Sequence, residues 1–357
     1  MKVLVCHPDL RAGGGAEDYV HALGGALRTA GHSVRMLDIH DLSLGAATWI
    51  PGLSRLTLMK HALVARAARQ IAGTHDLVIF GFGEGPDCPV PRVEIRHAPS
   101  LRSLRRDHLD TIGCAGRGPI HRGLKRLNTV LGIVVAGRRR TNPALTITNS
   151  DWTLGRAQTC GRVVYPPVRA RPVPAIARVP GRIVSLGRLV PNKRHDEAIR
   201  IAQDLHRGGI DVTLDIVGRS DAVHLRHLRA LTHDMPFVRL LPDADDATRL
   251  RALAEATLGL HCYRHEHFGI AAAEMILAGV VPVVFDGGGI TELVPDHALR
   301  FRCHRGAVTA ARRVFTMPDA GRAATLKALQ AGHVLERSMR FEAEIIEALA
   351  PCLEPAG

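Results

Sequence analysis

The chain has 357 residues, of which 46% are hydrophobic, and this length and composition predict two domains with separate hydrophobic cores. Its seven cysteines form no C-x-x-C pair, which argues against a zinc site or a disulfide framework and fits a reducing cytosol. The longest apolar run is far shorter than the roughly 20 residues of a membrane span, and the start MKVLVC is too short an apolar run for a signal peptide.

The first part of the chain alternates short apolar runs with helical patterns. Residues 2–6, 33–37 and 76–80 read as strands, whereas residues 20–31 and 60–73 have the apolar spacing of helices. Strands that alternate with helices predict a parallel sheet with helices on both faces, as in Rossmann-like domains.

A glycine-rich loop, Gly13-Gly14-Gly15, lies between the first strand and the first helix. Strand, glycine loop and helix N-terminus together form an arrangement that cradles phosphate groups, because glycine lets the backbone approach a ligand closely. Gly14 and Gly15 are therefore candidate donor-binding residues. The alternative is an ordinary flexible loop.

The net charge of +13 is unevenly distributed along the sequence. Residues 1–165 hold 22 Lys and Arg against 12 Asp and Glu, whereas the rest of the chain is nearly balanced, with 25 against 22. Most of the excess lies in residues 92–140, here called the basic segment, which hold twelve basic and three acidic residues. Such one-sided charge attracts anionic lipid, phosphate-bearing acceptors or nucleic acid.

The basic segment also contains a predicted helix, residues 124–138, whose apolar side includes Leu127, Leu131 and Val134. Two interpretations stay open: the apolar side rests on an anionic membrane surface, or it packs inward and the arginines merely solvate the surface. Nucleic acid is the less favoured partner, since the segment lacks interleaved aromatic residues and a recognisable recognition helix.

Prolines are dense between the two halves of the sequence, from Pro166 to Pro180. Proline excludes helix and favours an extended, semi-rigid linker. We therefore expect a Rossmann-like domain over residues 1–165, a linker over 166–181, a second Rossmann-like domain over 182–335 and a C-terminal helix over 336–357. The sequence leaves open whether that helix crosses back to the first domain.

The second half begins with another unit of strand, loop and helix. The strand ends at Gly187, and Arg188 and Lys193 lie in the loop that follows it. A further strand, residues 212–217, ends at Gly218. Ligands bind at the carboxyl ends of such strands, and two cations five positions apart can clamp a diphosphate.

The most informative stretch is a turn, helix and strand over residues 261–284. Glu266 lies at its polar entry, Phe268-Gly269-Ile270 open the helix, and Glu274 lies inside the helix among small and apolar residues. A helix N-terminus presents free N–H groups and a partial positive charge to a diphosphate, and carboxylates beside it suit sugar hydroxyls. Together these features predict a site for a sugar nucleotide.

Four motifs resemble those of the retaining nucleotide-sugar glycosyltransferases of family 4: E-H-F-G-I-A-A-A-E-M, G-R-x-x-x-x-K, G-G-A-E and N-S-x-W-T. The first is especially similar to that of the eukaryotic mannosyltransferases that extend the dolichol-linked oligosaccharide. The resemblance implies an α/β fold of two facing Rossmann-like domains (GT-B) with an interdomain cleft. The second domain would bind the nucleotide sugar and the first the acceptor, with retention at the anomeric carbon and without a metal ion or another cofactor.

The resemblance also implies roles for individual residues. Glu266 would hold hydroxyls of the donor sugar, Glu274 those of the ribose, and Arg188 and Lys193 would neutralise the leaving diphosphate. His97 by itself reads as an ordinary strand-end residue, but it matches a histidine that points toward the donor sugar in the family. The candidate catalytic residues are Glu266, Arg188, Lys193 and His97, and the donor-binding set adds Gly14, Gly15, Gly187, Gly218, Phe268, Gly269, Ile270 and Glu274.

The function we expect is transfer of a mannose-like or glucose-like hexose from a nucleotide-diphosphate sugar to a lipid-linked saccharide or another glycan. One alternative is a soluble small-molecule acceptor, such as a secondary metabolite. Another is a nucleotide-sugar-binding protein without activity, although the intact motifs argue against it. We expect the protein in the cytoplasm, with peripheral attachment to the inner face of the membrane left open. The nucleotide, the sugar and the linkage are not specified by the sequence.

Overall fold

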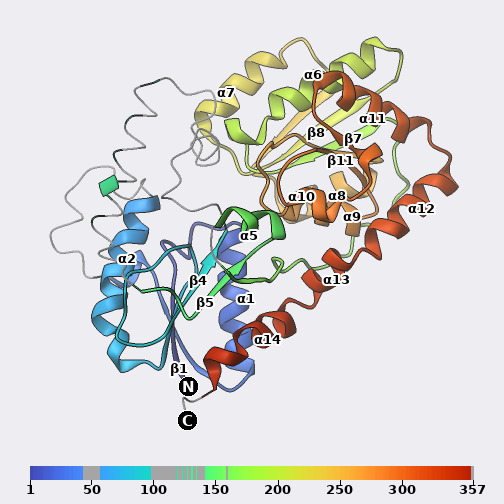
Figure 1. The fold of residues 1–357 in the computed structure, drawn as a ribbon. Coiled ribbons are helices and arrows are strands. Elements are labelled where there is room, and N and C mark those ends of the chain that lie inside the picture. The colour runs from blue at the N-terminus through green and yellow to red at the C-terminus, as the bar shows by residue number, and fades with distance from the viewer. Residues whose placement is uncertain are drawn as a thin grey trace. The chain divides into compact units, whose positions relative to one another are not determined.

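The computed structural model describes residues 1–42, 57–97, 141–157 and 160–354, together with residues 119, 123, 127, 130, 131 and 134. The chain divides into two compact units. Met1–Pro167 and Arg340–Gly357 form unit 1, and Val168–Met339 forms unit 2 (Figure 1). Each unit is a parallel sheet with helices packed on it, which confirms the predicted α/β fold of two Rossmann-like domains.

Unit 1 is built on a six-stranded parallel sheet in the order β2-β1-β3-β4-β5-β6. Its strands are β1 (Lys2–Cys6), β2 (Ser33–Leu37), β3 (Leu77–Phe80), β4 (Arg92–Arg96), β5 (Leu145–Thr148) and β6 (Arg162–Val163). Its helices, among the described residues, include α1 (Gly15–Thr29), α2 (Thr57–Ile71), α5 (Asp151–Ala157) and α14 (Phe341–Leu353).

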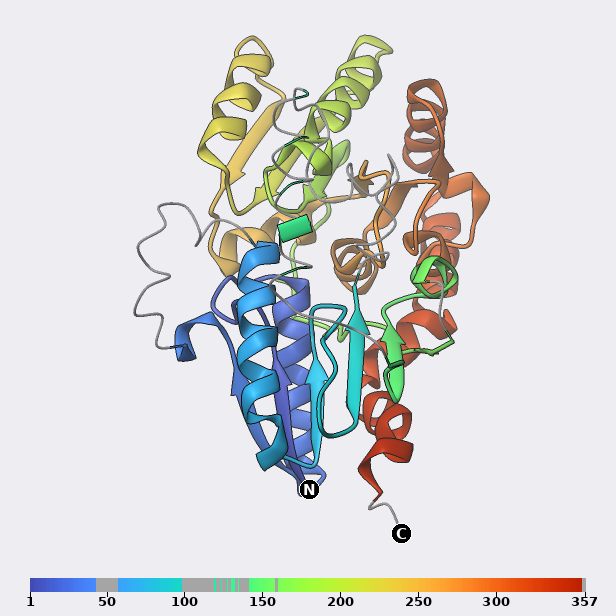
Figure 2. The ribbon, with the colours of Figure 1, turned by 60° about the vertical axis from the view of Figure 1, so that its left-hand side comes forward.

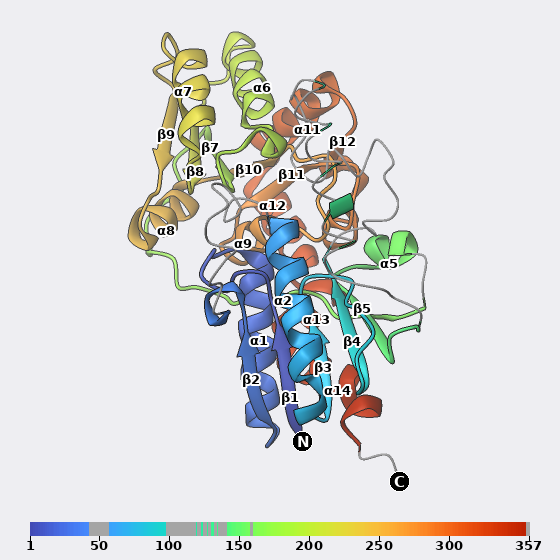
Figure 3. The ribbon, with the colours of Figure 1, turned by 90° about the vertical axis from the view of Figure 1, so that its left-hand side faces the viewer.

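Alternate side chains of β1 supply the cores on the two faces of this sheet. Val3 and Val5 pack with residues of α1 and α14, whereas Leu4 and Cys6 pack with residues of α2. Neighbouring residues of a strand point to opposite faces, so a strand that is apolar at consecutive positions is buried on both sides. Figure 2 and Figure 3 show α1 and α2 running alongside the strands.

Helix α14, the last helix of the chain, belongs to unit 1 although the helices before it belong to unit 2. The ring of Phe341 meets the ring of Tyr19 on α1 edge to face, with 4.7 Å between the centroids. Ile345 and Leu349 are buried in the same core. Apolar contacts between residues more than 300 positions apart therefore attach the tail to the first sheet.

Unit 2 is built on a second six-stranded parallel sheet, in the order β12-β11-β10-β7-β8-β9. Its strands are β7 (Arg182–Leu186), β8 (Thr213–Gly218), β9 (Val238–Pro242), β10 (Leu258–His261), β11 (Val281–Phe285) and β12 (Arg300–Phe301). Its helices include α6 (His195–Arg207), α7 (Ala222–Leu231), α8 (Asp246–Glu255), α9 (Ile270–Leu277), α10 (Ile290–Leu293), α11 (His304–Thr316), α12 (Asp319–Gln330) and α13 (His333–Met339). Across the described part of the chain, no helix combines the length and the apolar character that a membrane crossing needs.

Residues 168–181, which the proline pattern predicts as a linker, are part of unit 2. Arg178 attaches this segment, because its guanidinium donates hydrogen bonds to the backbone carbonyls of Leu253, Ala256 and Ala278. These carbonyls lie at the C-terminal ends of α8 and α9, where a cation also meets the negative end of each helix dipole. The segment has no helix or strand, as its prolines require, but it is held in place.

Candidate functional site

Two glycines bring the loops after β7 and β8 together at the carboxyl edge of the unit 2 sheet. Gly187 has a φ of 145° and Gly218 a φ of 157°, values that other residues rarely adopt. A Cβ on Gly218 would lie 2.0 Å from the carbonyl oxygen of Gly187, so a side chain cannot fit there. Both predicted glycines therefore serve the close packing of the two loops that follow these strands.

The loop after β7 carries both predicted cations and is held by His195, which the sequence analysis did not identify. His195 is buried, with Nδ1 3.1 Å from the Ser185 hydroxyl and Nε2 3.2 Å from the backbone carbonyl of Arg188. Burial lowers the pKa of His195 to about 4, so the ring is neutral near pH 7. Since a carbonyl only accepts, Nε2 carries the proton and donates to Arg188, and Nδ1 accepts from Ser185.

The structure brings Lys193 and Glu266 into direct contact across the ends of β7 and β10. The Lys193 Nζ lies 2.6 Å from Oε2 of Glu266, and Nε2 of His261 lies 2.8 Å from the same oxygen. Burial raises the pKa of Glu266, but Lys193 and His261 outweigh this effect and hold it well below its usual value. The carboxylate is therefore ionised and fixed. Lys193 also lies over the ring of Tyr263, 4.7 Å from its centroid.

Arg188 and Glu274 have different surroundings from this pair. Arg188 is exposed, and its guanidinium forms no ion pair within the described residues. Glu274, on α9, accepts a hydrogen bond from the Arg249 guanidinium on α8 at 2.8 Å. The structure thus places Glu274 in its own ion pair, separate from the Lys193–Glu266 contact.

Helix α9 begins later than the sequence pattern predicts. The motif places Phe268 at the helix opening, but the first helical residue is Ile270. The preceding Gly269 has a left-handed φ of 101°, and Phe268 is buried. Glu266 therefore lies outside the helix, and helical spacing does not relate it to Glu274. The α9 N-terminus has no side-chain cap, so its first backbone N–H groups can bind an anion.

The glycine loop after β11 packs directly on the Glu266 backbone. Gly288 forms an isolated parallel bridge with Glu266, and a Cβ on Gly288 would lie 2.1 Å from the Glu266 carbonyl oxygen. Gly288 also has a φ of 92°, in the left-handed region. This loop therefore fixes the backbone of the candidate catalytic carboxylate from the side of β11.

The predicted residues Gly14, Gly15 and His97 lie in unit 1. Gly14 precedes α1, where a Cβ would come within 2.8 Å of Oε2 of Glu17, and Gly15 is the first residue of the helix. His97 Nε2 is 3.1 Å from the Gly81 carbonyl, and burial lowers its pKa to about 4. The neutral ring therefore donates to the backbone from Nε2.

His7, at the end of β1, is a second buried histidine in unit 1 that the sequence analysis did not single out. Its Nε2 lies 3.9 Å from Oε1 of Glu17, and its ring meets Phe82 edge to face. Burial, aided by the neighbouring His97, lowers its pKa to about 3. Two neutral imidazoles thus occupy the carboxyl edge of the unit 1 sheet.

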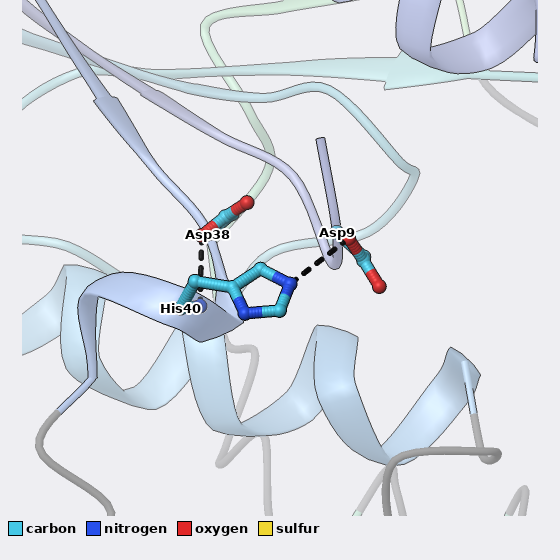
Figure 4. A group of neighbouring side chains, drawn as sticks. All are labelled: Asp9, Asp38 and His40. Atoms are coloured by element: carbon cyan, nitrogen blue, oxygen red, sulfur yellow. Dashed lines mark hydrogen bonds and ion pairs between the residues drawn. The ribbon is translucent and has the colours of Figure 1, made fainter. Parts of the chain in front are cut away.

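Three possible metal ligands meet in the described residues, at Asp9, Asp38 and His40 of unit 1 (Figure 4). Each already has a partner. Asp9 accepts from His40 at 3.3 Å and from Lys60 at 2.5 Å, and Asp38 accepts from the backbone N–H of His40 at 2.8 Å. The Lys60 ammonium already neutralises Asp9, so this group is an ion-pair and capping network that ties β1 to β2.

A hollow of about 410 Å³ in unit 2 is lined by residues other than the predicted ones. Its lining includes four arginines, of which three already face carboxylates: Arg194 faces Glu197, Arg200 faces Asp196, and Arg302 faces Asp286. The residues lining it are Arg194, Glu197, Arg200, Arg264, Arg302, Cys303 and His304. These pairs neutralise most of the positive charge of the hollow, and we assign no ligand to it.

Comparison with known families identifies the class of unit 2. Residues 170–315 match the family described as Glycosyl transferases group 1, and this region contains Arg188, Lys193, Glu266 and Glu274. Residues 170–315 are therefore a glycosyl transferases group 1 domain, which confirms the coarser part of the resemblance, that to glycosyltransferases.

Curated relatives give a more particular likeness. The human protein named GDP-Man:Man(3)GlcNAc(2)-PP-Dol alpha-1,2-mannosyltransferase is 29% identical over 165 residues, which cover 40% of this chain and 34% of that protein. The protein of the same name from Yarrowia lipolytica is 29% identical over 176 residues, covering 41% and 28%. The matched stretch thus spans about a third of the length of these relatives.

Solved structures resemble the whole chain. HepE of Anabaena, in complex with UDP and glucose, superimposes with a TM-score of 0.66 at 16% identity, covering 98% of this chain and 100% of that one. WaaG, a glycosyltransferase involved in lipopolysaccharide biosynthesis, has a TM-score of 0.69 at 14% identity, covering 96% and 99%. At this identity the likeness concerns the fold, and it confirms the fold class, two Rossmann-like domains of the GT-B type.

Proposed function

We propose that this protein is a retaining, metal-independent hexosyltransferase that uses a nucleotide-diphosphate sugar as donor and a lipid-linked saccharide or another glycan as acceptor. The observation that carries the proposal is the contact of Lys193 with Glu266 at the carboxyl edge of the unit 2 sheet. A cation for a diphosphate and a carboxylate for sugar hydroxyls lie side by side there, 2.6 Å apart. Both belong to a glycosyl transferases group 1 domain.

The chemistry follows from charge. In the transfer, the anomeric carbon exchanges its bond to the diphosphate oxygen for a bond to an acceptor hydroxyl oxygen, which releases its proton, and negative charge grows on the leaving diphosphate. Lys193, the exposed guanidinium of Arg188 and the N–H groups at the start of α9 would stabilise that charge. Glu266 would accept hydrogen bonds from hydroxyls of the donor sugar, and Glu274 from those of the ribose. These groups can balance a diphosphate without a metal ion.

The comparisons favour two nucleotides, GDP and UDP, for a first test of the donor. The matched relatives have GDP-Man in their names, and HepE was crystallised with UDP and glucose. A panel of GDP-mannose, GDP-glucose, UDP-glucose and UDP-N-acetylglucosamine should therefore be incubated with the purified protein, and the released nucleoside diphosphate measured. We expect release from at least one donor, above that of a Lys193→Ala, Glu266→Gln double variant. Release equal to that of the double variant with every donor would contradict the proposal.

An acceptor held at an anionic membrane is supported by an exposed apolar stripe in unit 1. Leu127, Val130, Leu131 and Val134 are each helical and are 55%, 47%, 45% and 70% exposed. In the sequence, their spacing of three, one and three positions is that of residues on one side of a helix. They include all the residues that the sequence analysis assigned to the apolar side of this helix.

The charge next to this stripe suits anionic lipid. In the sequence, Arg122, Lys125 and Arg126 come at its start, and Arg138, Arg139 and Arg140 follow it. An apolar face flanked by basic residues is typical of segments that lie in a membrane interface. We therefore propose peripheral attachment to the inner face of the membrane, where a lipid-linked acceptor would be presented. A soluble acceptor remains the alternative if the protein does not bind vesicles.

A further inference from the structure

The two carboxylate oxygens of Glu266 have different surroundings. Oε2 accepts from Lys193 at 2.6 Å and from His261 at 2.8 Å. Oε1 accepts no hydrogen bond from any described residue, and the side chain is 13% exposed. One oxygen is thus fixed by the protein, and the other is left to accept a hydrogen bond from a ligand.

The two partners of Oε2 differ in how firmly they are held. His261 is the last residue of β10, its backbone pairs with β11 opposite Val284, and it is 3% exposed. Lys193 lies in the short 3-10 turn after β7 and is 18% exposed. A side chain on a central strand keeps its position better than a long lysine on a loop. His261 is therefore the rigid partner and Lys193 the movable one.

The proposed function makes two demands on the ion pair. Lys193 must contact the donor diphosphate, while Glu266 must contact the donor sugar. A diphosphate carries more negative charge than a carboxylate, so it competes with Glu266 for the ammonium group of Lys193. As Lys193 shifts, a mostly buried carboxylate loses its closest partner, which is costly unless another donor stays in place.

We propose that His261 is a positioning residue that holds Oε2 of Glu266 while Lys193 shifts to the donor diphosphate. Oε1 then remains aimed at a sugar hydroxyl throughout donor binding. This inference rests on the proposed function. It involves no covalent step: Nε2 of His261 carries a proton and donates it in a hydrogen bond, and only Lys193 exchanges one anionic partner for another.

The test is a double-variant cycle on donor turnover, using the donor that the parent protein cleaves best in the panel above. His261→Ala should lower kcat/KM about 30-fold, because Glu266 then has no fixed donor once Lys193 leaves it. His261→Gln, which keeps an N–H group near the place of Nε2, should recover to within about fivefold of the parent. In a Glu266→Gln background, His261→Ala should change kcat/KM by less than about threefold.

A purely structural role for His261 predicts a different result. The losses of kcat/KM from His261→Ala and Glu266→Gln would then multiply in the double variant. His261→Gln would also fail to restore kcat/KM, even with the thermal stability of the parent. Either result would overturn the inference. His227→Ala is the matched control, since His227 is an exposed histidine of α7 in the same unit and should leave kcat/KM unchanged.

Failure of the proposed function gives a separate result. A parent protein that releases no nucleoside diphosphate from any donor contradicts the transferase proposal and, with it, the role of His261 in donor binding. An active parent with multiplicative variants overturns only the His261 inference. Thermal unfolding of the parent, His261→Ala, Glu266→Gln and the double variant checks the contact without turnover. Independent reductions of Tm by His261→Ala and Glu266→Gln would show that the two side chains do not act together.

Discussion

The two sheets of this protein have the same parallel architecture, but their carboxyl edges differ in charge. In unit 2, Lys193 and Glu266 form an ion pair beside the exposed Arg188. In unit 1, His7 is buried and His97 is half-buried, and their pKa values are lowered to about 3 and about 4, so both rings are neutral near pH 7. The first edge thus offers an ion pair and an exposed cation, whereas the second places two neutral imidazoles near the carboxylate of Glu17.

This difference teaches how one fold can serve two ligands. A charged edge suits a diphosphate, whose binding depends on electrostatic attraction, whereas neutral imidazoles suit hydroxyl groups. In the sequence, most of the basic excess of unit 1 falls in the basic segment, residues 92–140. Under the proposed function, unit 2 would bind the donor and unit 1 would meet the acceptor.

The largest expected effect on donor turnover comes from removing either of the two candidate cations of unit 2. Arg188→Ala and Lys193→Ala should each lower kcat/KM for donor turnover by about 30–1,000-fold, which corresponds to about 2–4 kcal/mol of transition-state stabilisation. Steady-state release of nucleoside diphosphate measures this. Arg226→Ala is the control, because Arg226 is an exposed arginine on α7. A change of less than about threefold for both variants would mean that these cations do not bind the diphosphate.

A second prediction concerns the charge and the apolar stripe of unit 1. The protein should float with vesicles that contain anionic lipid, but not with neutral vesicles, and physiological salt should weaken this binding. Replacing Arg138, Arg139 and Arg140 by Gln should weaken it about 100-fold, since each basic residue near the surface contributes roughly 1 kcal/mol.

Substitutions in the apolar stripe distinguish its contribution to vesicle binding from that of the basic residues that flank it. Leu127→Ser with Val134→Ser should reduce flotation at every salt concentration, since both side chains are more than half exposed. Val223→Ser, at an exposed apolar residue of unit 2, is the control. Absence of binding under all conditions would favour a soluble acceptor instead.

Acid should affect unit 1 more than unit 2. Among the described histidines, burial lowers the pKa of His7, His61 and His97 in unit 1 and of His195 in unit 2. A histidine with a lowered folded-state pKa takes up its proton mainly when unfolded, so stability falls as the pH falls from about 6.5 toward about 4. For His97 alone the loss between pH 7 and pH 5 is about 2 kcal/mol.

Hydrogen exchange of the full chain at pH 7 and pH 5, expressed as protection factors, tests whether acid destabilises unit 1 more than unit 2. Peptides of unit 1 should lose protection first. His97→Gln should reduce the pH dependence of unfolding by urea. Equal loss of protection in both units, or an unchanged pH dependence in the variant, would contradict the predicted difference.

The smallest expected effect is that of chelation. If Arg188 and Lys193 balance the diphosphate without a metal ion, donor turnover should stay within about twofold after dialysis against EDTA. Loss of activity in EDTA that Mg²⁺ or Mn²⁺ restores would show that the mechanism is of another class.

Much of the fold could be predicted because its signals are local. Apolar runs of strand length alternate with helical spacing, and that alternation predicts parallel sheets in both halves. Boundaries were less predictable. The motif places the helix opening at Phe268, but Gly269 takes a left-handed conformation and α9 begins at Ile270. The hydrogen bonds of Arg178 to the ends of α8 and α9 could not be predicted, since they join distant residues.

The candidate site shows the same division. Arg188, Lys193, Glu266 and Glu274 were predicted from their places at strand and helix ends together with motifs that resemble those of a glycosyltransferase family, and their roles stay predictions. His195 and His261 were not, because each lies at a position where the sequence pattern shows only one more histidine near a strand. Their importance comes from contacts with Ser185 and with Oε2 of Glu266, which no local pattern encodes.

The sequence by itself determined the class of fold, the separation into two parts, the basic excess of the first part and the motif residues of the second. Periodicity and composition encode the first three features, since they depend on neighbouring residues, whereas the motif residues were singled out by their resemblance to a known family. Only the tertiary structure decided that Lys193 and His261 share one oxygen of Glu266, that Glu274 pairs with Arg249, and that α14 packs on the first sheet. These are contacts between distant positions, and chain packing alone brings such positions together.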